Sequence, residues 1–301
     1  MQIDFANLKI QHNLYKEEIE EAILKVARDC NFIMGTQIDE LERNLEKFTG
    51  SKYAISCSSG TDALLLAMMA LDIQPDDEII TTPFTFFATA ETIAFLKAKP
   101  VFVDIDEKTY NIDPKKIEEK ISSKTKAIIP VSLYGQPCDM DEINQIAKKY
   151  NLKVIVDGAQ SFGSTYKGES DSNLGDISCT SFFPAKPLGC YGDGGALFTN
   201  DEKLADKIKS LRLHGQSIRY HHQYIGMGGR LDTIQAAVLN VKLKYYEKDL
   251  KLRQDVAEKY TKALNEKNIE TPFVKSDRTS AWAQYSIRVQ NRTKLQTKLQ
   301  N

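Results

Sequence analysis

The sequence predicts an α/β fold in which helices cover both faces of a largely parallel sheet. Between residues 53 and 200, short uninterrupted apolar segments alternate with segments whose apolar residues recur at helical spacing. Continuously apolar strands are typical of sheets buried on both faces, where helices connect parallel neighbours. The 301 residues, 42% hydrophobic and 27% charged, suffice for about two domains and exclude collagen, a coiled coil or wholesale disorder.

The individual elements follow from the same patterns. Residues 15–30 place Ile19, Ala22, Ile23 and Val26 on one side, which predicts an amphipathic helix. Buried strands are predicted at 53–57, 78–82, 100–105, 126–133, 153–157, 177–183 and 195–200. Helices between them are predicted at 61–71, 89–98, 114–121 and 140–150.

The last part of the chain has a different pattern. Residues 234–265 form a long polar helical stretch, followed by a strand at 283–289 and a polar helix at 292–301. The expected units are an N-terminal arm and helix at 1–30, a large domain at 31–240, and a connector helix with a small domain at 241–301. One strand and two helices make a thin core, so we expect this small domain to be incomplete, as in a truncated chain.

Charge and composition exclude several classes of partner. Forty Lys and Arg against 41 Asp and Glu give a formal charge of −1, which argues against a nucleic-acid binder. No signal-peptide pattern opens the chain, and the longest apolar stretch, 63–71, is too short to cross a bilayer. Five dispersed cysteines favour reduced thiols in a cytoplasm, and the histidines at 214, 221 and 222 lack the spacing of a metal site.

A Ser/Gly/Thr turn, residues 58–62, opens the helix predicted at 61–71. Free backbone N–H groups in this turn would lie at the positive end of the helix dipole, which suits a phosphate. Taken alone, these residues are better explained by plain N-capping by a serine or threonine.

Asp157 is the last residue of the strand predicted at 153–157. Ligands of open α/β sheets bind at the carboxyl ends of the strands, so this carboxylate is a candidate site residue. An aspartate at a strand end also commonly caps a turn, which is the structural alternative.

Lys186 lies in a turn rich in proline and glycine, just past an apolar strand. A partly desolvated lysine has a lowered pKa and reacts with carbonyl groups, whereas a solvated loop lysine has no such role. Together, a phosphate-binding helix start, a carboxylate for a ring nitrogen and a Schiff-base lysine are the parts that pyridoxal phosphate requires.

With these three elements the chain resembles the DegT/DnrJ-type aminotransferases of fold type I, which act on nucleotide-linked sugars. The resemblance extends along the whole chain. It is carried by the segments SSGTDALLLA, PFTFFATAET, PVFVDID, VSLYGQ, VDGAQSFG, SFFPAKPLGCYGDGGA, LHGQ and RLDTIQAAVL. It implies a largely parallel α/β domain that binds pyridoxal 5′-phosphate within residues 31–240.

The resemblance also implies roles for matching residues. Lys186 would bond to the cofactor and move a proton between substrate and cofactor, and Asp157 would keep the ring nitrogen protonated. Phe86 would stack on the ring, and Gln160 would lie near its 3′ oxygen or near Asp157. The phosphate would be held by Gly60, Thr61 and Ser181.

Arg230 would reach across a homodimer interface, because the family's active site is shared between two chains. Its guanidinium would pair with a sugar carboxylate or diphosphate, although a surface ion pair is an equally good interpretation of this residue. The implied reaction aminates C3 of a UDP-linked 3-oxo-N-acetylglucosaminuronate, with glutamate as donor, for polysaccharide, lipopolysaccharide or glycan synthesis.

Two alternatives remain at this level. One is amination at C4 of a 4-keto-6-deoxy nucleotide sugar. The other is a truncated or catalytically impaired homologue, because Gly228 stands where the family usually has Asn and Ala185 where Ser commonly precedes the lysine. The presence of both Lys186 and Asp157 favours an enzyme.

Overall fold

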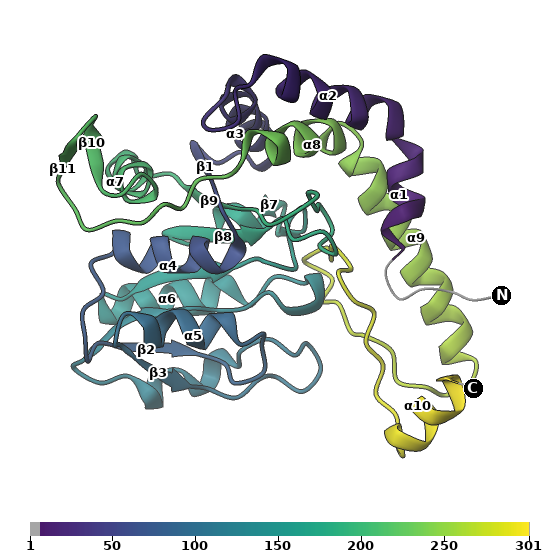
Figure 1. Cartoon of the computed structure of the whole chain (residues 1–301). Coiled ribbons are helices and arrows are strands. Elements are labelled where there is room, and N and C mark those ends of the chain that lie inside the picture. Colours follow the sequence, from purple (N-terminus) through teal and green to yellow (C-terminus); the bar gives the residue numbers. More distant parts are fainter. Residues whose placement is uncertain (1–6, 301) are drawn as a thin grey trace.

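The computed structural model describes residues 7–300 and confirms the α/β fold with a mostly parallel sheet. In this part of the chain the main sheet has the strand order β1-β9-β8-β5-β4-β2-β3 (Figure 1). Its strands are β1 (Tyr53–Cys57), β2 (Glu78–Thr81), β3 (Lys99–Phe102), β4 (Thr125–Ile128), β5 (Lys153–Asp157), β8 (Ile177–Ser181) and β9 (Gly195–Thr199). Only β9 among them runs antiparallel to its neighbours, so the other six point the same way.

Alternate side chains of each strand enter cores on opposite faces of the sheet. In β5, Ile155 joins one core, whereas Val154 and Val156 join another. In β9, the neighbouring residues Leu197 and Phe198 likewise enter different cores on opposite faces of the sheet. This two-residue alternation with apolar groups on both sides explains why the strands are continuous apolar runs in the sequence.

Helices cover both faces of the sheet. One face carries α4 (Gly60–Ala70), α5 (Ala88–Phe95) and α7 (Glu202–Arg212). The opposite face carries α6 (Met140–Tyr150) and, toward β1 and β9, α3 (Thr36–Thr49) and α8 (Thr233–Leu243). The helices therefore bury both sides of the strands and leave the loops at the strand ends accessible.

The N-terminal helices pack outside this layer. After α1 (Leu8–Leu14), α2 (Lys16–Asp29) places Ile19 against Val238 and Val241 of α8. Figure 1 shows α2 lying along α8 at the top of the molecule. Residues 1–6 of the expected arm, and Asn301, lie outside the described part of the chain.

Several expected elements were wrong. Residues 114–121 form the 3₁₀ turns η1 (Pro114–Lys116) and η2 (Glu118–Lys120) instead of an α-helix, with i→i+3 bonds such as Ile117 N to Pro114 O. The strand expected at 126–133 ends at Ile128, because Pro130 cannot donate to the ladder. Residues 283–289 form no strand. They make a single isolated bridge, between Arg288 and Glu270, and no ladder extends from it.

The long helix expected at 234–265 is divided. It consists of α8 and of α9 (Tyr246–Asn265), and the helix predicted near the end is α10 (Arg292–Gln300). Helices α3 and α7 were not predicted. Two further 3₁₀ turns are η3 (Leu133–Gly135) and η4 (Asp171–Asn173). Two small hairpins pair β6 (Thr165–Tyr166) with β7 (Glu169–Ser170), and β10 (Gln216–Ile218) with β11 (His221–His222). Among residues 7–300, no helix combines the length and apolar character needed to cross a bilayer.

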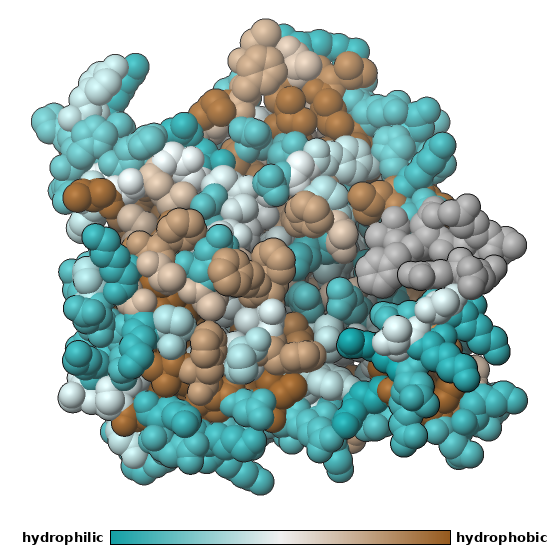
Figure 2. Space-filling view, turned by 60° about the horizontal axis from the view of Figure 1, so that its bottom comes forward, coloured by the Kyte–Doolittle hydropathy of each residue, from teal (hydrophilic) through white to brown (hydrophobic). Residues whose placement is uncertain are grey.

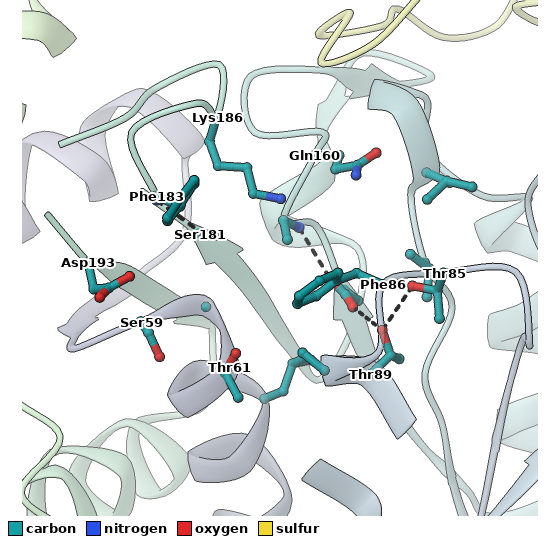
Figure 3. A pocket seen from close by; sticks show the side chains of 18 residues that line it. Ser59, Thr61, Thr85, Phe86, Thr89, Gln160, Ser181, Phe183, Lys186 and Asp193 are labelled. Carbon is teal, nitrogen blue, oxygen red and sulfur yellow. Dashed lines mark hydrogen bonds between the residues drawn. The ribbon is translucent and has the colours of Figure 1, made fainter. Parts of the chain in front are cut away.

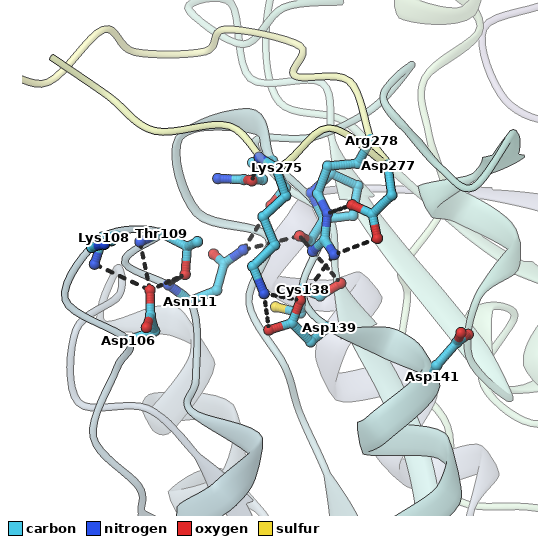
Figure 4. A network of polar contacts seen from close by, with 12 residues as sticks. Asp106, Lys108, Thr109, Asn111, Cys138, Asp139, Asp141, Lys275, Asp277 and Arg278 are labelled. Carbon is cyan, nitrogen blue, oxygen red and sulfur yellow. Dashed lines mark hydrogen bonds and ion pairs between the residues drawn. The ribbon is translucent and has the colours of Figure 1, made fainter.

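The segment after α9 returns to the sheet and is fixed there by charged groups (Figure 4). Asp139 accepts from Lys275 Nζ at 2.7 Å and pairs with the Arg278 guanidinium at 2.9 Å. Arg278 also donates to the carbonyls of Pro137 and Cys138, and its side chain is only 2% exposed. These contacts attach the C-terminal segment to the loop that follows β4.

We predict that Arg278→Leu lowers the free energy of unfolding by about 3–5 kcal/mol, because it leaves the Asp139 carboxylate with one cation fewer in a mostly buried site. Arg288→Leu is the matched control, since its side chain is 40% exposed and its partners are surface glutamates. Urea unfolding of both variants provides the measurement. Equal stability of the two variants would contradict a structural role for the buried pair.

Candidate functional site

A cavity of about 450 Å³ opens at the edge where the carboxyl ends of the six co-directional strands meet (Figure 3). The loops after β1, β2, β4, β5 and β8 all contribute to it. It is lined by Ser59, Gly60, Thr61, Leu64, Thr85, Phe86, Ala88, Thr89, Val131, Leu133, Asp157, Ala159, Gln160, Ser181, Phe183, Lys186, Asp193 and Gly194. Seven of the predicted site residues therefore share one cavity, and Arg230 is not among its lining residues.

The start of α4 forms one wall. Ser59 caps the helix by accepting from Asp62 N at 3.0 Å, which confirms the capping interpretation for this serine. Gly60 permits a close approach to β8, because a Cβ at this position would lie 2.6 Å from the Ser181 Cβ. The helix N-terminus, Thr61 and Ser181 thus lie together, and this arrangement of donors suits an anion.

Asp157 lies at the end of β5 and is 5% exposed. Its carboxylate accepts from Thr89 Oγ1 at 2.8 Å and from Ala159 N at 3.2 Å. Burial raises the pKa of Asp157, and the two hydrogen bonds and the nearby charge of Lys186 oppose that rise. The carboxylate is therefore held in one orientation at the cavity wall.

Lys186 extends from the loop after β8 toward the middle of the cavity (Figure 3). Its backbone N–H donates to Phe183 O at 2.8 Å, which closes a tight turn. Burial lowers the pKa of the Lys186 amine, and the charge of Asp157 partly offsets this shift. A desolvated lysine with a lowered pKa is suited to attack a carbonyl carbon.

Aromatic and amide side chains complete the opposite wall. Phe86 lines the cavity and is 73% exposed, so its ring lies at the entrance. Gln160 Oε1 accepts from Tyr134 N at 2.6 Å, which fixes the amide against the loop after β4.

Some lining residues were not predicted from the sequence. Thr89 bonds to Asp157, and Thr85 bonds in turn to Thr89 at 3.0 Å. Thr85 lies in the loop before α5 and Thr89 in the first turn of that helix, so no regular spacing in the sequence marks this pair. Phe183 and Asp193 also line the cavity, where the geometry of the sheet and the turn places them, and no local pattern marks them.

A second buried carboxylate, Asp171, lies behind Asp157 and was also missed. It is 1% exposed and accepts from Ser132 Oγ at 3.1 Å and from Ser161 Oγ. Its backbone N–H donates to Ser164 O at 3.0 Å, so it holds the turn that follows Asp157 at two points. Burial raises the pKa of Asp171 to about 6, although the hydrogen bonds from both serine hydroxyls lower that pKa.

Arg230 and the histidine-rich stretch lie apart from this cavity. Arg230 is partly exposed. Next to Gly228, the space that a side chain would need is occupied by the His214 imidazole, which would lie 3.1 Å from a Cβ at that position. His221 and His222 are exposed on β11 of a protruding hairpin (Figure 1). Within residues 7–300 no group of His, Cys, Asp or Glu side chains is arranged to hold a metal ion.

These features fit pyridoxal 5′-phosphate on their own chemistry. The cavity offers an amine with a lowered pKa, a buried carboxylate that can face a ring nitrogen, and a helix N-terminus where a phosphate would be stabilised. They define the class of pyridoxal phosphate-dependent aminotransferases of fold type I.

The chain belongs to the DegT/DnrJ/EryC1/StrS aminotransferase family, whose model matches residues 13–301. Aminotransferases of this family use pyridoxal phosphate, which confirms the expected cofactor and the expected class of enzyme.

Individual relatives are similar over nearly the whole chain. The UDP-2-acetamido-2-deoxy-3-oxo-D-glucuronate aminotransferase of Pseudomonas aeruginosa is 52% identical over 297 residues, 99% of this chain and 83% of the relative. The UDP-N-acetyl-3-dehydro-alpha-D-glucosamine 3-aminotransferase of Acidithiobacillus ferrooxidans is 39% identical, over 99% of this chain and 80% of the relative.

A solved structure of DesV from S. venezuelae, in complex with a ketimine intermediate, is similar in three dimensions. The match has a TM-score of 0.97 at 32% identity and covers 99% of this chain and 81% of DesV. Because the match covers 99% of this chain, it includes the central sheet and the segments that line the cavity.

We predict that Asp171→Asn stabilises the protein by about 1–3 kcal/mol at pH 8, because the wild type buries a charge there and one pKa unit corresponds to about 1.4 kcal/mol. The folded-state pKa lies above the ordinary value of 3.8, so the folded chain holds this proton longer than the unfolded chain. The stability difference between variant and wild type should therefore shrink from pH 6 toward pH 4. Urea unfolding over this range measures it, and a difference independent of pH would contradict the assignment.

Proposed function

We propose that this protein transfers an amino group from glutamate to C3 of a UDP-linked 3-oxo-N-acetylglucosaminuronate. The observation that carries the proposal is the convergence of Lys186 and Asp157 on one cavity of a family member. The substrate is supported by the relative that is 52% identical, whose name specifies a 3-oxo glucuronate.

In this proposal Lys186 and Asp157 act on particular atoms of the cofactor and the substrate. Lys186 Nζ would hold the cofactor covalently. Once the amino group of the donor has displaced it, the freed lysine amine would move a proton to and from the substrate carbon. Asp157 would keep a proton on the ring nitrogen, and Thr89 holds the Asp157 carboxylate in place through its 2.8 Å hydrogen bond. When bound, pyridoxal phosphate supplies an electron sink for the carbanion electrons of the amino-acid or sugar carbon.

The cofactor's other groups would be held by the cavity walls. We assign the phosphate to the backbone of Gly60, to Thr61 and to Ser181, because these donors lie at the N-terminus of α4. Phe86 would cover one ring face, and Gln160 would contact the 3′ oxygen or the Asp157 side. Exclusion of water by Phe86 would strengthen the electrostatic contacts inside the cavity.

Amination at C3 is favoured over C4. Both relatives described above carry a 3-oxo or 3-dehydro group in their names. The C4 alternative has no comparable support among them. We also propose a role in polysaccharide synthesis, lipopolysaccharide included, because the expected product is an amino sugar activated by UDP.

We propose that the active protein is a homodimer in which Arg230 serves the partner's site. Around the cavity mouth Phe86, Phe87 and Phe183 are 73%, 72% and 51% exposed. Figure 2 shows hydrophobic side chains reaching the surface in several places between polar ones. Clustered exposed apolar groups favour a protein interface, and a partly exposed Arg230 outside its own cavity is consistent with a role in the other chain.

A cytoplasmic location is also proposed. It is supported by the five cysteines, which are unpaired in the structure, four of them buried. Buried thiols without disulfides are usual in reducing compartments.

We predict that pyridoxal phosphate produces an absorbance band at the edge of the visible region in the wild type, and that Lys186→Ala abolishes it. The reason is that the band requires a covalent bond to the lysine amine. Lys203→Ala, which removes an exposed lysine on α7, is the control and should retain the full band. A band that persists in Lys186→Ala, or is absent from the wild type, would overturn the assignment.

We predict that glutamate bleaches this band and that the UDP-linked 3-oxo sugar restores it, whereas a 4-keto-6-deoxy nucleotide sugar does not. In Asp157→Asn the band should form but bleach about a hundredfold more slowly, the usual cost of losing one preorganised electrostatic partner. Stopped-flow absorbance measures both rates. Restoration by the 4-keto sugar alone would favour amination at C4.

A further inference from the structure

Lys242 is a buried lysine near the turn that carries Lys186. It lies on α8 and is 3% exposed. Its Nζ donates to Gly189 O at 2.6 Å and to Gln11 Oε1 at 3.1 Å, and lies 4.8 Å from the centre of the Tyr191 ring. The amine therefore has a partner in three directions.

None of these partners is charged. Lysines are rarely buried without a paired acid, so two neutral oxygens and an aromatic face make an unusual environment for an ammonium group. Among the described residues, the charged or titratable groups that face it are Asp249 on α9, Cys190 and Tyr191 in the turn, and Lys9 and His12 on α1. Burial raises the pKa of Cys190 to about 11, so this thiol stays neutral near pH 8.

The bond to Gly189 fixes the end of the Lys186 turn. Cys190 N donates to Phe182 O at 2.8 Å, and a Cβ at Gly189 would lie 2.4 Å from Pro184 O. The two ends of the turn are thus packed against each other. A donor that holds the Gly189 carbonyl therefore restricts the whole turn, and with it the base of the Lys186 side chain.

Lys242 also connects the turn to the N-terminal helix α1. Gln11 supplies one acceptor, and His12 Nδ1 lies 2.8 Å from the Tyr191 hydroxyl. Beside the amine lies a cavity of about 350 Å³, bordered by residues of α1 and of the turn. This space leaves room for a larger cationic side chain at position 242.

We propose that Lys242 is a positioning residue, which holds the Lys186 turn in its cofactor-binding conformation through the Gly189 carbonyl and couples it to α1. The inference rests on the proposed role of Lys186. Lys242 itself does not line the cavity that contains Lys186. It acts on cofactor binding through the backbone of the turn.

The charge of Lys242 provides a distinctive pH signature. Burial lowers the pKa of Lys242 to about 8 from an ordinary value of 10.5. Loss of the proton above pH 8 removes the charge assistance from the bond to Gly189, so affinity for pyridoxal phosphate should fall. The unfolded chain keeps this proton to higher pH, so the stability of the cofactor-free protein should rise over the same interval.

The experiment measures the dissociation constant of pyridoxal phosphate from the lysine-dependent absorbance band between pH 7 and pH 9. Wild type should lose about threefold to tenfold in affinity over this range. Lys242→Met should bind about tenfold more weakly at pH 7, the effect of one charge-assisted hydrogen bond. Lys242→Arg, which keeps its charge at all these pH values, should retain the affinity of wild type at pH 7 and lose less of it at pH 9.

Controls separate positioning from a merely structural role. Lys244→Met removes an exposed lysine at the end of α8 and should behave as wild type. Thermal unfolding of the cofactor-free proteins is the second control. Between pH 7 and pH 9, the stability of wild type should rise relative to that of Lys242→Arg, whereas its affinity for pyridoxal phosphate should fall. Any titration at Lys186 or at the bound cofactor would be common to both proteins, so the difference between them reports Lys242.

The outcomes are distinguishable. Wild-type affinity in Lys242→Met, or identical pH profiles of affinity in wild type and Lys242→Arg, would overturn the inference while leaving the proposed function intact. Absence of a lysine-dependent band in wild type would overturn both. If Lys242→Met does not fold, the comparison of wild type with Lys242→Arg still decides the question.

Discussion

Six strands of the central sheet point in one direction, and the position of every candidate residue depends on that shared direction. The loops after β1, β2, β4, β5 and β8 meet at one edge because parallel strands end on the same side. The antiparallel β9 begins at this edge, which places Asp193 and Gly194 beside the loop of Lys186. Residues more than a hundred positions apart thus line one cavity.

Close backbone contacts then bring the loops together. Side chains at Gly60 and Gly195 would collide with Ser181 and with the Ser59 carbonyl, at 2.6 and 2.4 Å. These glycines let the start of α4 lie directly against the ends of β8 and β9. Without this contact the phosphate donors proposed on α4 and Ser181 would be separated.

Buried charge dominates the chemistry of the site. Burial moves the pKa of Asp157 up and that of Lys186 down, and each shift is opposed by the charge of the other residue. The surroundings of Asp157 are fixed by hydroxyl groups that donate to carboxylates: Thr89 orients Asp157, and Asp171 with its two serines holds the turn that follows. On the other side, Lys242 contacts the turn of Lys186 in the same indirect way. Preorganised polar groups of this kind make an active site effective, because they need not reorganise during the reaction.

Most strands, the parallel sheet and the three residue groups of the site could be predicted from the sequence alone. Continuous apolar runs and a lysine in a Pro/Gly-rich turn are local patterns, and local patterns are readable without a structure. Helix α3 was also readable, since Ile38, Leu41 and Leu45 recur at helical spacing. The same holds for α7, in which Ala205, Ile208 and Leu211 do so. The end of the strand before Pro130 was readable in the same way, because a proline cannot donate to the ladder. Tertiary structure alone decided the division of the long helix before Tyr246 and the buried contacts of Asp171 and Lys242. Their roles depend on which distant groups pack around them, and burial of a charge is a property of the folded chain that no neighbouring residue in the sequence reveals.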